Sequence, residues 1–201
     1  MSDGKAIGGV VAGAVVVATL AVFATFILTN AEKSKTELPV YGTVPDFEFV
    51  NQDSVAFGRD DLLGKITVVD FFFTTCQTIC PVMVVEKQKL YNAFDDTDNF
   101  QIVSISVNPQ HDSPDVMKQY GREHGVTDHR WNFLNGPVEE VQRVSEKGFM
   151  LPADNLPMGH SSKFALVDRY GQIRGYYNSL EQKPMIALQE QIIVLLQQMQ
   201  E

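Results

Sequence analysis

The alternation of hydrophobic and polar positions divides this chain of 201 residues into an uncharged N-terminal stretch, a short polar run and a longer region of periodic elements. The uncharged stretch covers residues 6–29, which are 24 consecutive positions without a charged side chain. A helix of that length rises about 36 Å, enough to cross a hydrocarbon layer of about 30 Å. The pattern therefore predicts a transmembrane anchor at 6–29 that follows a short tail at 1–5.

A secretory signal peptide is the alternative interpretation of the uncharged stretch. The apolar region of such a peptide normally spans about 7 to 15 residues and ends in a small-x-small cleavage site. Here the stretch is longer and continues as Thr29-Asn30-Ala31, so a retained anchor is favoured. Residues 30–43 are polar and partly charged, which predicts a linker, and a globular domain is expected over 44–201.

Two runs in the globular region, Lys65–Thr74 and Gln101–Val107, are rich in β-branched and apolar residues. Such runs predict strands that are buried on both faces of a sheet. Shorter alternations predict a hairpin of 47–49 and 55–57 around a turn at 51–53, a strand at 131–134, and a second hairpin of 163–168 and 172–178.

Helical spacing of apolar residues predicts four helices, at 81–94, 114–125, 138–149 and 184–200. In the first of them Val82, Val85, Leu90 and Phe94 are expected to form the buried face. The order strand, helix, strand, helix, short strand, helix, hairpin, helix fits a thioredoxin-like α/β fold. In this fold a mixed sheet lies between layers of helices.

The net charge of the chain is −9, and it belongs to the globular domain. Residues 1–38 contain three acidic and three basic residues, which cancel, so residues 39–201 carry all of the excess. An acidic domain of this kind is poorly suited to nucleic acid, whose phosphates require basic side chains. We therefore expect no nucleic-acid partner.

The only two cysteines, Cys76 and Cys80, lie between the end of a predicted buried strand and the start of a helix at Pro81. A helix N-terminus carries a partial positive charge, so we expect both thiols to ionise more easily than a free cysteine. The three intervening residues leave room for an ion between the sulfurs, although the same loop can also close into a disulfide. Two thiolates select soft or borderline metals such as Cu(I) or Zn(II).

His160 is the histidine best placed to join the two cysteines. It directly precedes the predicted strand at 163–168. In a thioredoxin-like fold the residue that enters this strand lies against the loop that carries the cysteines. The other three histidines, His111, His124 and His129, lie in polar segments and are interpreted as solvated or capping residues. We also predict that Phe71, Phe72 and Phe73 lie in the core. Two methionines, Met83 and Met158, are predicted to pack or to gate the site rather than to ligate.

Three segments, FTTCQTICPVM, SVNPQHDSPDVMKQY and GHSSKFALVDRYGQIRGYY, resemble the Sco/SenC family of cytochrome c oxidase assembly proteins. The resemblance runs across most of residues 44–198. It implies a membrane-anchored copper metallochaperone, rather than an enzyme, with one Cu(I) or Cu(II) ion per chain and with Cys76, Cys80 and His160 as ligands. One departure is Asn108, where the family more often has aspartate.

The resemblance also implies partners and a location. The expected partners are subunit II of cytochrome c oxidase, whose dinuclear CuA centre the family helps to load, and other copper chaperones. The expected location is the bacterial cytoplasmic membrane with the domain in the periplasm, or the mitochondrial inner membrane with the domain in the intermembrane space. In either case the protein is expected to cross the membrane once.

Three other functions fit part of the pattern. A thiol-disulfide oxidoreductase would use Cys76 and Cys80 as a redox pair, for instance to reduce the CuA-site cysteines, but His160 has no obvious task in that chemistry. A peroxidase would use Cys76 against peroxide, although no arginine lies near the pair in the sequence. An inert disulfide would close only a short loop and would therefore stabilise the fold little.

Overall fold

The computed structural model describes residues 38–200. Within this range no helix is both long and apolar enough to span a membrane. The predicted anchor at 6–29, the tail at 1–5 and most of the predicted linker lie outside the described residues.

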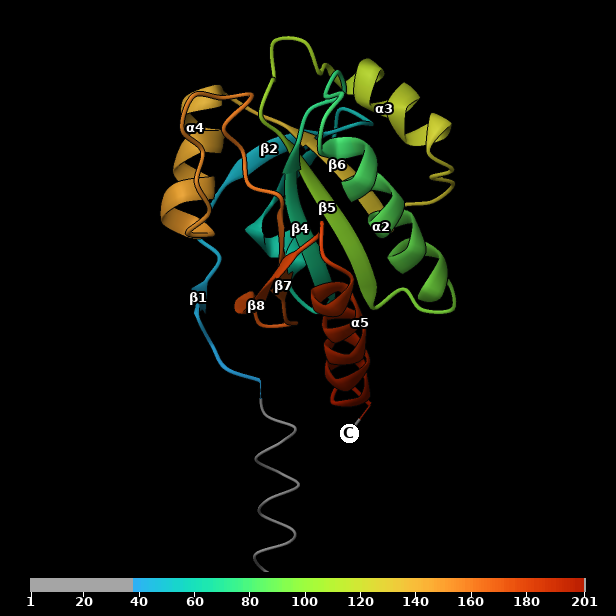
Figure 1. Cartoon of the computed structure of the whole chain (residues 1–201). Coiled ribbons are helices and arrows are strands. Elements are labelled where there is room, and N and C mark those ends of the chain that lie inside the picture. Colours follow the sequence, from blue (N-terminus) through green and yellow to red (C-terminus); the bar gives the residue numbers. More distant parts are fainter. Residues whose placement is uncertain (1–37, 201) are drawn as a thin grey trace, which may run out of the picture. The chain divides into compact units, whose positions relative to one another are not determined.

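A mixed sheet of eight strands forms the centre of the domain, in the order β1-β8-β7-β4-β5-β6-β2-β3 (Figure 1). The three central strands run parallel to one another and the other neighbouring strands pair antiparallel. The strands are β1 (Gly42–Thr43), β2 (Glu48–Asn51), β3 (Ala56–Gly58), β4 (Ile66–Phe72), β5 (Phe100–Ser106), β6 (Trp131–Asn135), β7 (Lys163–Val167) and β8 (Gln172–Asn178).

Helices cover both faces of the sheet, with α2, α3 and α5 on one face and α4 on the other (Figure 1). Two consecutive residues of β4 show the division. Phe71 meets the ring of Phe149, just beyond α4, with centroids 5.9 Å apart, whereas Phe72 meets Tyr120 of α3 at 5.6 Å. The helical segments are a 3-10 turn (Arg59–Leu62), α2 (Cys80–Ala93), α3 (Pro114–Glu123), α4 (Val138–Arg143), a π-helical turn (Val144–Gly148) and α5 (Gln182–Gln197).

The predicted strands and both predicted hairpins are confirmed, because the sequence pattern reflects real burial. Every residue of β4 and of β5 is buried, as the two continuous runs predict. In the first hairpin Phe49 pairs with Phe57, and the side chain of Asn51 accepts hydrogen bonds from the backbone of Asp53 and Val55 to hold the turn.

The structure differs from the sequence prediction at two helices and at the start of the domain. The helix predicted at 138–149 divides into α4 and the π-helical turn. The buried face predicted for α2 is wrong in part, because Val82 and Val85 are each 46% exposed. Residues assigned to the linker join the sheet, since β1 pairs with β8 and the backbone N–H of Tyr41 donates to Ile173 O at 2.8 Å.

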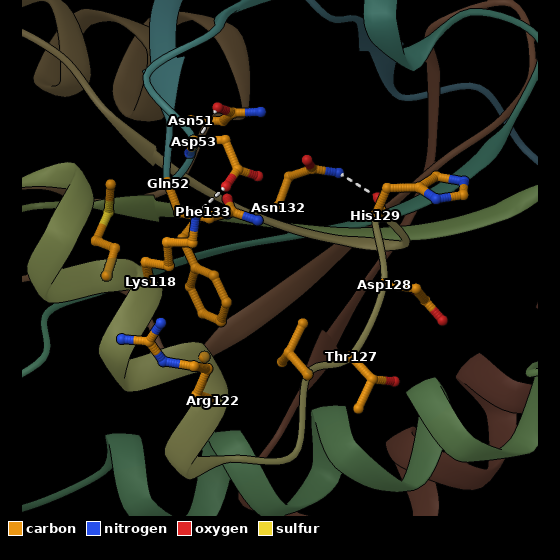
Figure 2. A pocket seen from close by; sticks show the side chains of 13 residues that line it. Asn51, Gln52, Asp53, Lys118, Arg122, Thr127, Asp128, His129, Asn132 and Phe133 are labelled. Carbon is orange, nitrogen blue, oxygen red and sulfur yellow. Dashed lines mark hydrogen bonds and ion pairs between the residues drawn. The ribbon is translucent and has the colours of Figure 1, made fainter.

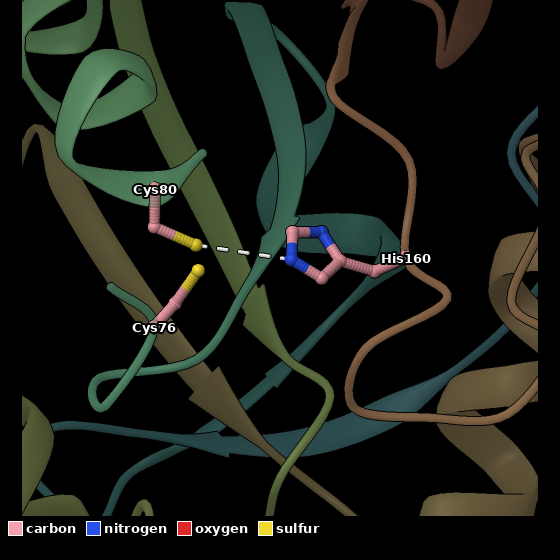
Figure 3. A group of neighbouring side chains, drawn as sticks. All are labelled: Cys76, Cys80 and His160. Carbon is pink, nitrogen blue, oxygen red and sulfur yellow. Dashed lines mark hydrogen bonds between the residues drawn. The ribbon is translucent and has the colours of Figure 1, made fainter. Parts of the chain in front are cut away.

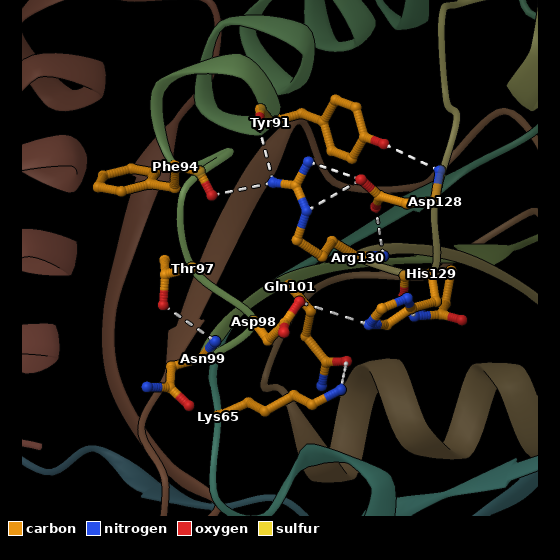
Figure 4. Close-up of polar contacts among 11 residues, drawn as sticks. Lys65, Tyr91, Phe94, Thr97, Asp98, Asn99, Gln101, Asp128, His129 and Arg130 are labelled. Carbon is orange, nitrogen blue, oxygen red and sulfur yellow. Dashed lines mark hydrogen bonds and ion pairs between the residues drawn. The ribbon is translucent and has the colours of Figure 1, made fainter.

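Arg130 fastens the C-terminal end of α2 to the start of β6 (Figure 4). Its guanidinium donates to the backbone oxygens of Tyr91 and Phe94, at 3.1 and 2.9 Å, where the helix has no further backbone partners of its own. The same group forms a two-pronged contact with Asp128, at 3.1 and 2.8 Å. The far end of α2 is therefore held by a charged side chain that is 7% exposed.

Lys87 shows why the buried face predicted for α2 was wrong in part. Its side chain is buried, and its ammonium group donates to Asp70 of β4 at 2.6 Å and to Ser104 of β5 at 2.9 Å. The hydroxyl of Ser104 donates in turn to Asp70 and accepts from the indole of Trp131, at 2.6 and 3.0 Å. The inward position that an apolar residue would normally occupy is taken by a charge that is paired with a buried carboxylate and a buried hydroxyl.

Replacing one partner of this ion pair should destabilise the domain strongly. In Lys87→Met the carboxylate of Asp70 remains buried without its counter-charge, so we expect the free energy of unfolding to fall by about 3 to 5 kcal/mol. The double variant Lys87→Met, Asp70→Asn should recover most of that loss because no unpaired charge remains. Urea unfolding of the fragment 39–201 measures both values, and equal losses in the single and double variants would contradict this account.

Candidate metal centre

The cysteine loop begins where β4 ends and finishes where α2 begins. A tight turn, with the N–H of Cys76 donating to Phe73 O at 3.3 Å, brings Cys76 back towards the end of the strand. Cys80 is the first residue of α2, and Pro81 follows it in the first helical turn, where a missing N–H costs nothing. Cys80 is 3% exposed, whereas Cys76 is only partly buried, so the two sulfurs have different surroundings.

His160 reaches the cysteines because of the strand order. Since β7 pairs antiparallel to β4, with Val69 opposite Ala165, the chain that enters β7 lies beside the carboxyl end of β4. A short bridge between Ala153 and His160 closes the loop before β7. Gly159 permits this closure, because a Cβ at that position would overlap the carbonyl oxygen of Asp154.

The imidazole of His160 is oriented by its neighbours. Its Nδ1 lies 3.1 Å from the carbonyl oxygen of Ser161, and since a carbonyl only accepts, Nδ1 carries the proton. Nε2 is then left with its lone pair and lies 3.8 Å from the sulfur of Cys80. The ring is 8% exposed and stands edge-on to Phe73, with centroids 5.6 Å apart. Burial lowers the pKa of His160, so the neutral form that can bind a metal is favoured.

The three side chains point at a common position (Figure 3). The two sulfurs and an imidazole nitrogen all lie within 4.8 Å of one another, and both cysteines are free thiols. A three-coordinate ion with sulfur bonds of about 2.3 Å needs donor atoms about 4 Å apart, so small side-chain movements would suffice to enclose it. Among residues 38–200 this is the only group of three or more such side chains with this spacing.

The expectation that both thiols ionise easily is correct for Cys76 and wrong for Cys80. Burial alone would raise the pKa of Cys76, but hydrogen bonds from the Thr78 side chain and from the backbone and side chain of Cys80 outweigh it and lower this pKa to about 7. Burial raises the pKa of Cys80 to about 12, and the neighbouring Cys76 adds to the effect. The position at the helix N-terminus is therefore not enough to ionise a sulfur that water cannot reach.

A buried carboxylate that the sequence analysis did not single out also holds the cysteine loop, through Thr74. Asp112, at the end of the loop that follows β5, accepts hydrogen bonds from the backbone and the hydroxyl of Thr74, at 3.2 and 2.5 Å. It also accepts from the hydroxyl of Ser106 at 2.6 Å. No short-range pattern in the sequence indicates this role, because the two partners of Asp112 are 6 and 38 residues away from it.

Most of the remaining candidate residues lie where the sequence analysis predicted. The three phenylalanines of β4 and the following loop are buried, as is Met83 at 1% exposure, which confirms packing for all four. Met158 is 67% exposed, so it does not pack, and a gating role for it stays a prediction. His111, His124 and His129 lie outside the three-residue cluster, as expected.

A second hollow lies between α3, the turn after β2 and the loop before β6 (Figure 2). No residue of the cysteine–histidine cluster lines it. Its polar groups are largely paired with one another: Lys118 contacts Asp53 at 2.8 Å, and Gln52 accepts from the backbone of Phe133 at 2.8 Å. These contacts give the polar side chains of the hollow a structural role. A thioredoxin-like domain with one buried cluster of two sulfurs and one nitrogen is the class of protein that these features define.

Comparison with known proteins identifies the family. The family model described as SCO1/SenC matches residues 36–194, and the chain belongs to that family. It is 31% identical over 154 residues to the SCO1 protein homolog of Bacillus subtilis, which covers 73% of this chain and 79% of that protein. The resemblance drawn from the three sequence segments is confirmed.

Solved structures of relatives confirm the thioredoxin-like α/β fold. BsSco, described as a member of the Sco family of cytochrome c oxidase assembly proteins with a disulfide switch, has a TM-score of 0.69 and 28% identity over 78% of this chain and 95% of that chain. The structure of Bradyrhizobium japonicum ScoI with copper bound has a TM-score of 0.62 and 25% identity, over 76% and 99% of the two chains.

The different surroundings of the two sulfurs predict different reactivity. In the reduced, metal-free fragment 39–201, alkylation of Cys76 by iodoacetamide should accelerate about tenfold per pH unit below its pKa of about 7 and level off above it, because the thiolate is the reactive form. Cys80 should stay far slower throughout the neutral range. Peptide mapping by mass spectrometry gives both rates, and faster alkylation of Cys80 would contradict the assignment.

Proposed function

We propose that the domain binds one copper ion through Cys76, Cys80 and His160 and delivers it to the CuA centre of cytochrome c oxidase subunit II. The observation that carries the proposal is the convergence of two thiol sulfurs and an unprotonated imidazole nitrogen within 4.8 Å. Membership of the SCO1/SenC family and the copper-bound structure of a relative support copper as the metal.

The donor set suits Cu(I), which prefers thiolates and accepts an imidazole as third ligand. Cys76 has a pKa of about 7 and supplies a thiolate at neutral pH, whereas Cys80 must release its proton when the ion binds. Because Cys76 is also the less buried sulfur, it is the ligand that an acceptor can displace first. The ion can then pass to an acceptor by exchange of one ligand at a time. The same three residues can also hold Cu(II), since an imidazole is among the donors.

The proposal includes partners and a location that follow from the sequence and the family. The acceptor is the CuA site of subunit II, the donor is another copper chaperone, and residues 6–29 anchor the chain in a membrane. The domain then works in the periplasm or in the mitochondrial intermembrane space. The description of BsSco as a cytochrome c oxidase assembly protein supports the choice of acceptor.

A second candidate function is reduction of a disulfide in the CuA site. A partly exposed thiol with a pKa of about 7 beside a buried thiol of much higher pKa is the arrangement of an attacking and a resolving cysteine. In this function Cys76 attacks the disulfide of the acceptor and Cys80 releases the mixed disulfide. The pair ends oxidised and the acceptor ends with two thiols.

Copper stoichiometry of the reduced fragment 39–201 tests the proposed site. We expect about one Cu(I) per chain in the unchanged fragment and loss of most of it in Cys76→Ala and in His160→Ala, because two remaining donors hold the ion poorly. His129→Ala, which removes an exposed imidazole outside the cluster, is the matched control and should keep full occupancy. Near-normal copper in both cluster variants would refute the site.

A CuA-domain acceptor separates delivery from reduction. If delivery is the main role, the copper-loaded fragment should metallate a pre-reduced acceptor, and the metal-free dithiol should reduce the oxidised acceptor slowly. His160→Ala distinguishes the two further, because it should abolish metal transfer and leave disulfide reduction nearly unchanged. Equal loss of both activities in this variant would count against two separable functions.

A further inference from the structure

The cysteine–histidine cluster is largely shielded from solvent, so an arriving ion needs a first contact at its rim. Cys80 and His160 are 3% and 8% exposed, and only Cys76 is partly accessible. The following inference rests on the proposed copper function and concerns how the ion reaches these ligands.

The loop between β5 and α3 is attached to the cysteine loop. Asp112 attaches it to the cysteine loop through the backbone and the hydroxyl of Thr74, two residues before Cys76. Two residues of extended chain span at most about 7 Å, so the backbone of Cys76 lies close to this attachment. A side chain on the loop is therefore held against Thr74, two residues before the more accessible cysteine.

His111 is such a side chain, and it is oriented as metal-binding histidines are. Its Nδ1 lies 3.1 Å from a carboxylate oxygen of Asp112 and 3.4 Å from the hydroxyl of Thr74. The carboxylate is fully buried and the imidazole is 51% exposed, so the ring is fixed from within and open to water on its other side. A hydrogen bond from one ring nitrogen to a carboxylate fixes the tautomer and leaves the other nitrogen as a basic donor for a metal.

The other ring nitrogen, Nε2, has no hydrogen-bond partner among residues 38–200. The pairing of an exposed imidazole with a buried carboxylate, two residues along the cysteine loop from a partly exposed cysteine, has no task in the proposed resident site. We infer that His111 is a transient copper ligand that captures the ion with Nε2 at the rim and passes it to Cys76.

The transfer is a ligand exchange without a change in oxidation state. A bond from copper to Nε2 of His111 forms first, a bond from copper to the sulfur of Cys76 then replaces it, and any thiol proton leaves to water. Cys80 and His160 complete the resident site afterwards. His111 therefore affects the rate of loading and leaves the final affinity unchanged.

The chain contains a matched control for this histidine. His129 is also exposed, at 70% for its side chain, and its Nε2 lies 3.8 Å from a carboxylate oxygen of Asp98. It precedes β6 at the amino ends of the parallel strands, whereas the cysteine loop follows the carboxyl end of β4. A general effect of removing a surface imidazole would thus be the same in His129→Ala and His111→Ala.

Rapid mixing of the reduced full-length chain in detergent with the copper(I)–bicinchoninate complex tests the inference, since loss of the absorbance of the complex reports transfer. His111→Ala should lower the loading rate constant by about tenfold, with an equilibrium affinity within about twofold of the unchanged chain. His129→Ala should match the unchanged chain in both. His111→Met should restore part of the rate, because a thioether also binds Cu(I), and a merely structural role would show no such rescue.

Two results would overturn the inference. One is a loading rate in His111→Ala equal to that of the unchanged chain and of His129→Ala. The other is a loss of equilibrium affinity in His111→Ala as large as in His160→Ala, which would make His111 a resident ligand. Failure of the unchanged chain to bind copper at all would instead reject the proposed function itself.

Discussion

The antiparallel pairing of β7 with β4 is the constraint on which the rest of this molecule depends. It sets the chain entering one strand beside the chain leaving the other, and so brings His160 to a cysteine 80 residues earlier in the sequence. The pairing is stable because both strands are almost entirely buried between helix layers. A shift of the register by one residue would turn every side chain of β7 to the opposite face and would destroy the core and the cluster together.

The two cysteines are chemically unequal because the fold treats them differently. Cys80 begins a helix and is packed inside, where the loss of water outweighs the favourable end of the helix dipole. Cys76 stays in the loop, where hydrogen bonds stabilise its thiolate. Under the proposed copper function, Cys76 would bind the ion as a thiolate before Cys80 loses its proton, and the same difference in pKa would suit disulfide exchange. The shared geometry explains why copper delivery and thiol reduction are hard to separate by sequence alone.

The sequence predicted what depends on short-range pattern. The strands, the hairpins, the cysteine loop and the placement of His160 at the start of β7 all followed from burial patterns, spacing and known fold order. It failed where the outcome depends on a distant partner. Lys87 is inward only because Asp70 and Ser104 lie opposite it, and Asp112 holds Thr74 across a gap in sequence of 38 residues. The pKa of Cys80 is raised, where the sequence analysis expected it to be lowered, for the same reason: burial depends on the whole fold.

The attachment of α2 limits where the domain can change its conformation. Arg130 clamps the last turn of this helix, and Lys87 pins its middle to the sheet. The first turn, with Cys80, has neither of these contacts, and the loop before it is held by Asp112 through Thr74. Under the proposed copper function, the change from a bound ion to a disulfide would then be confined to a few residues at this end of the helix. Under the proposed function, a partner that distinguishes the copper-bound form from the disulfide form would have to contact those few residues.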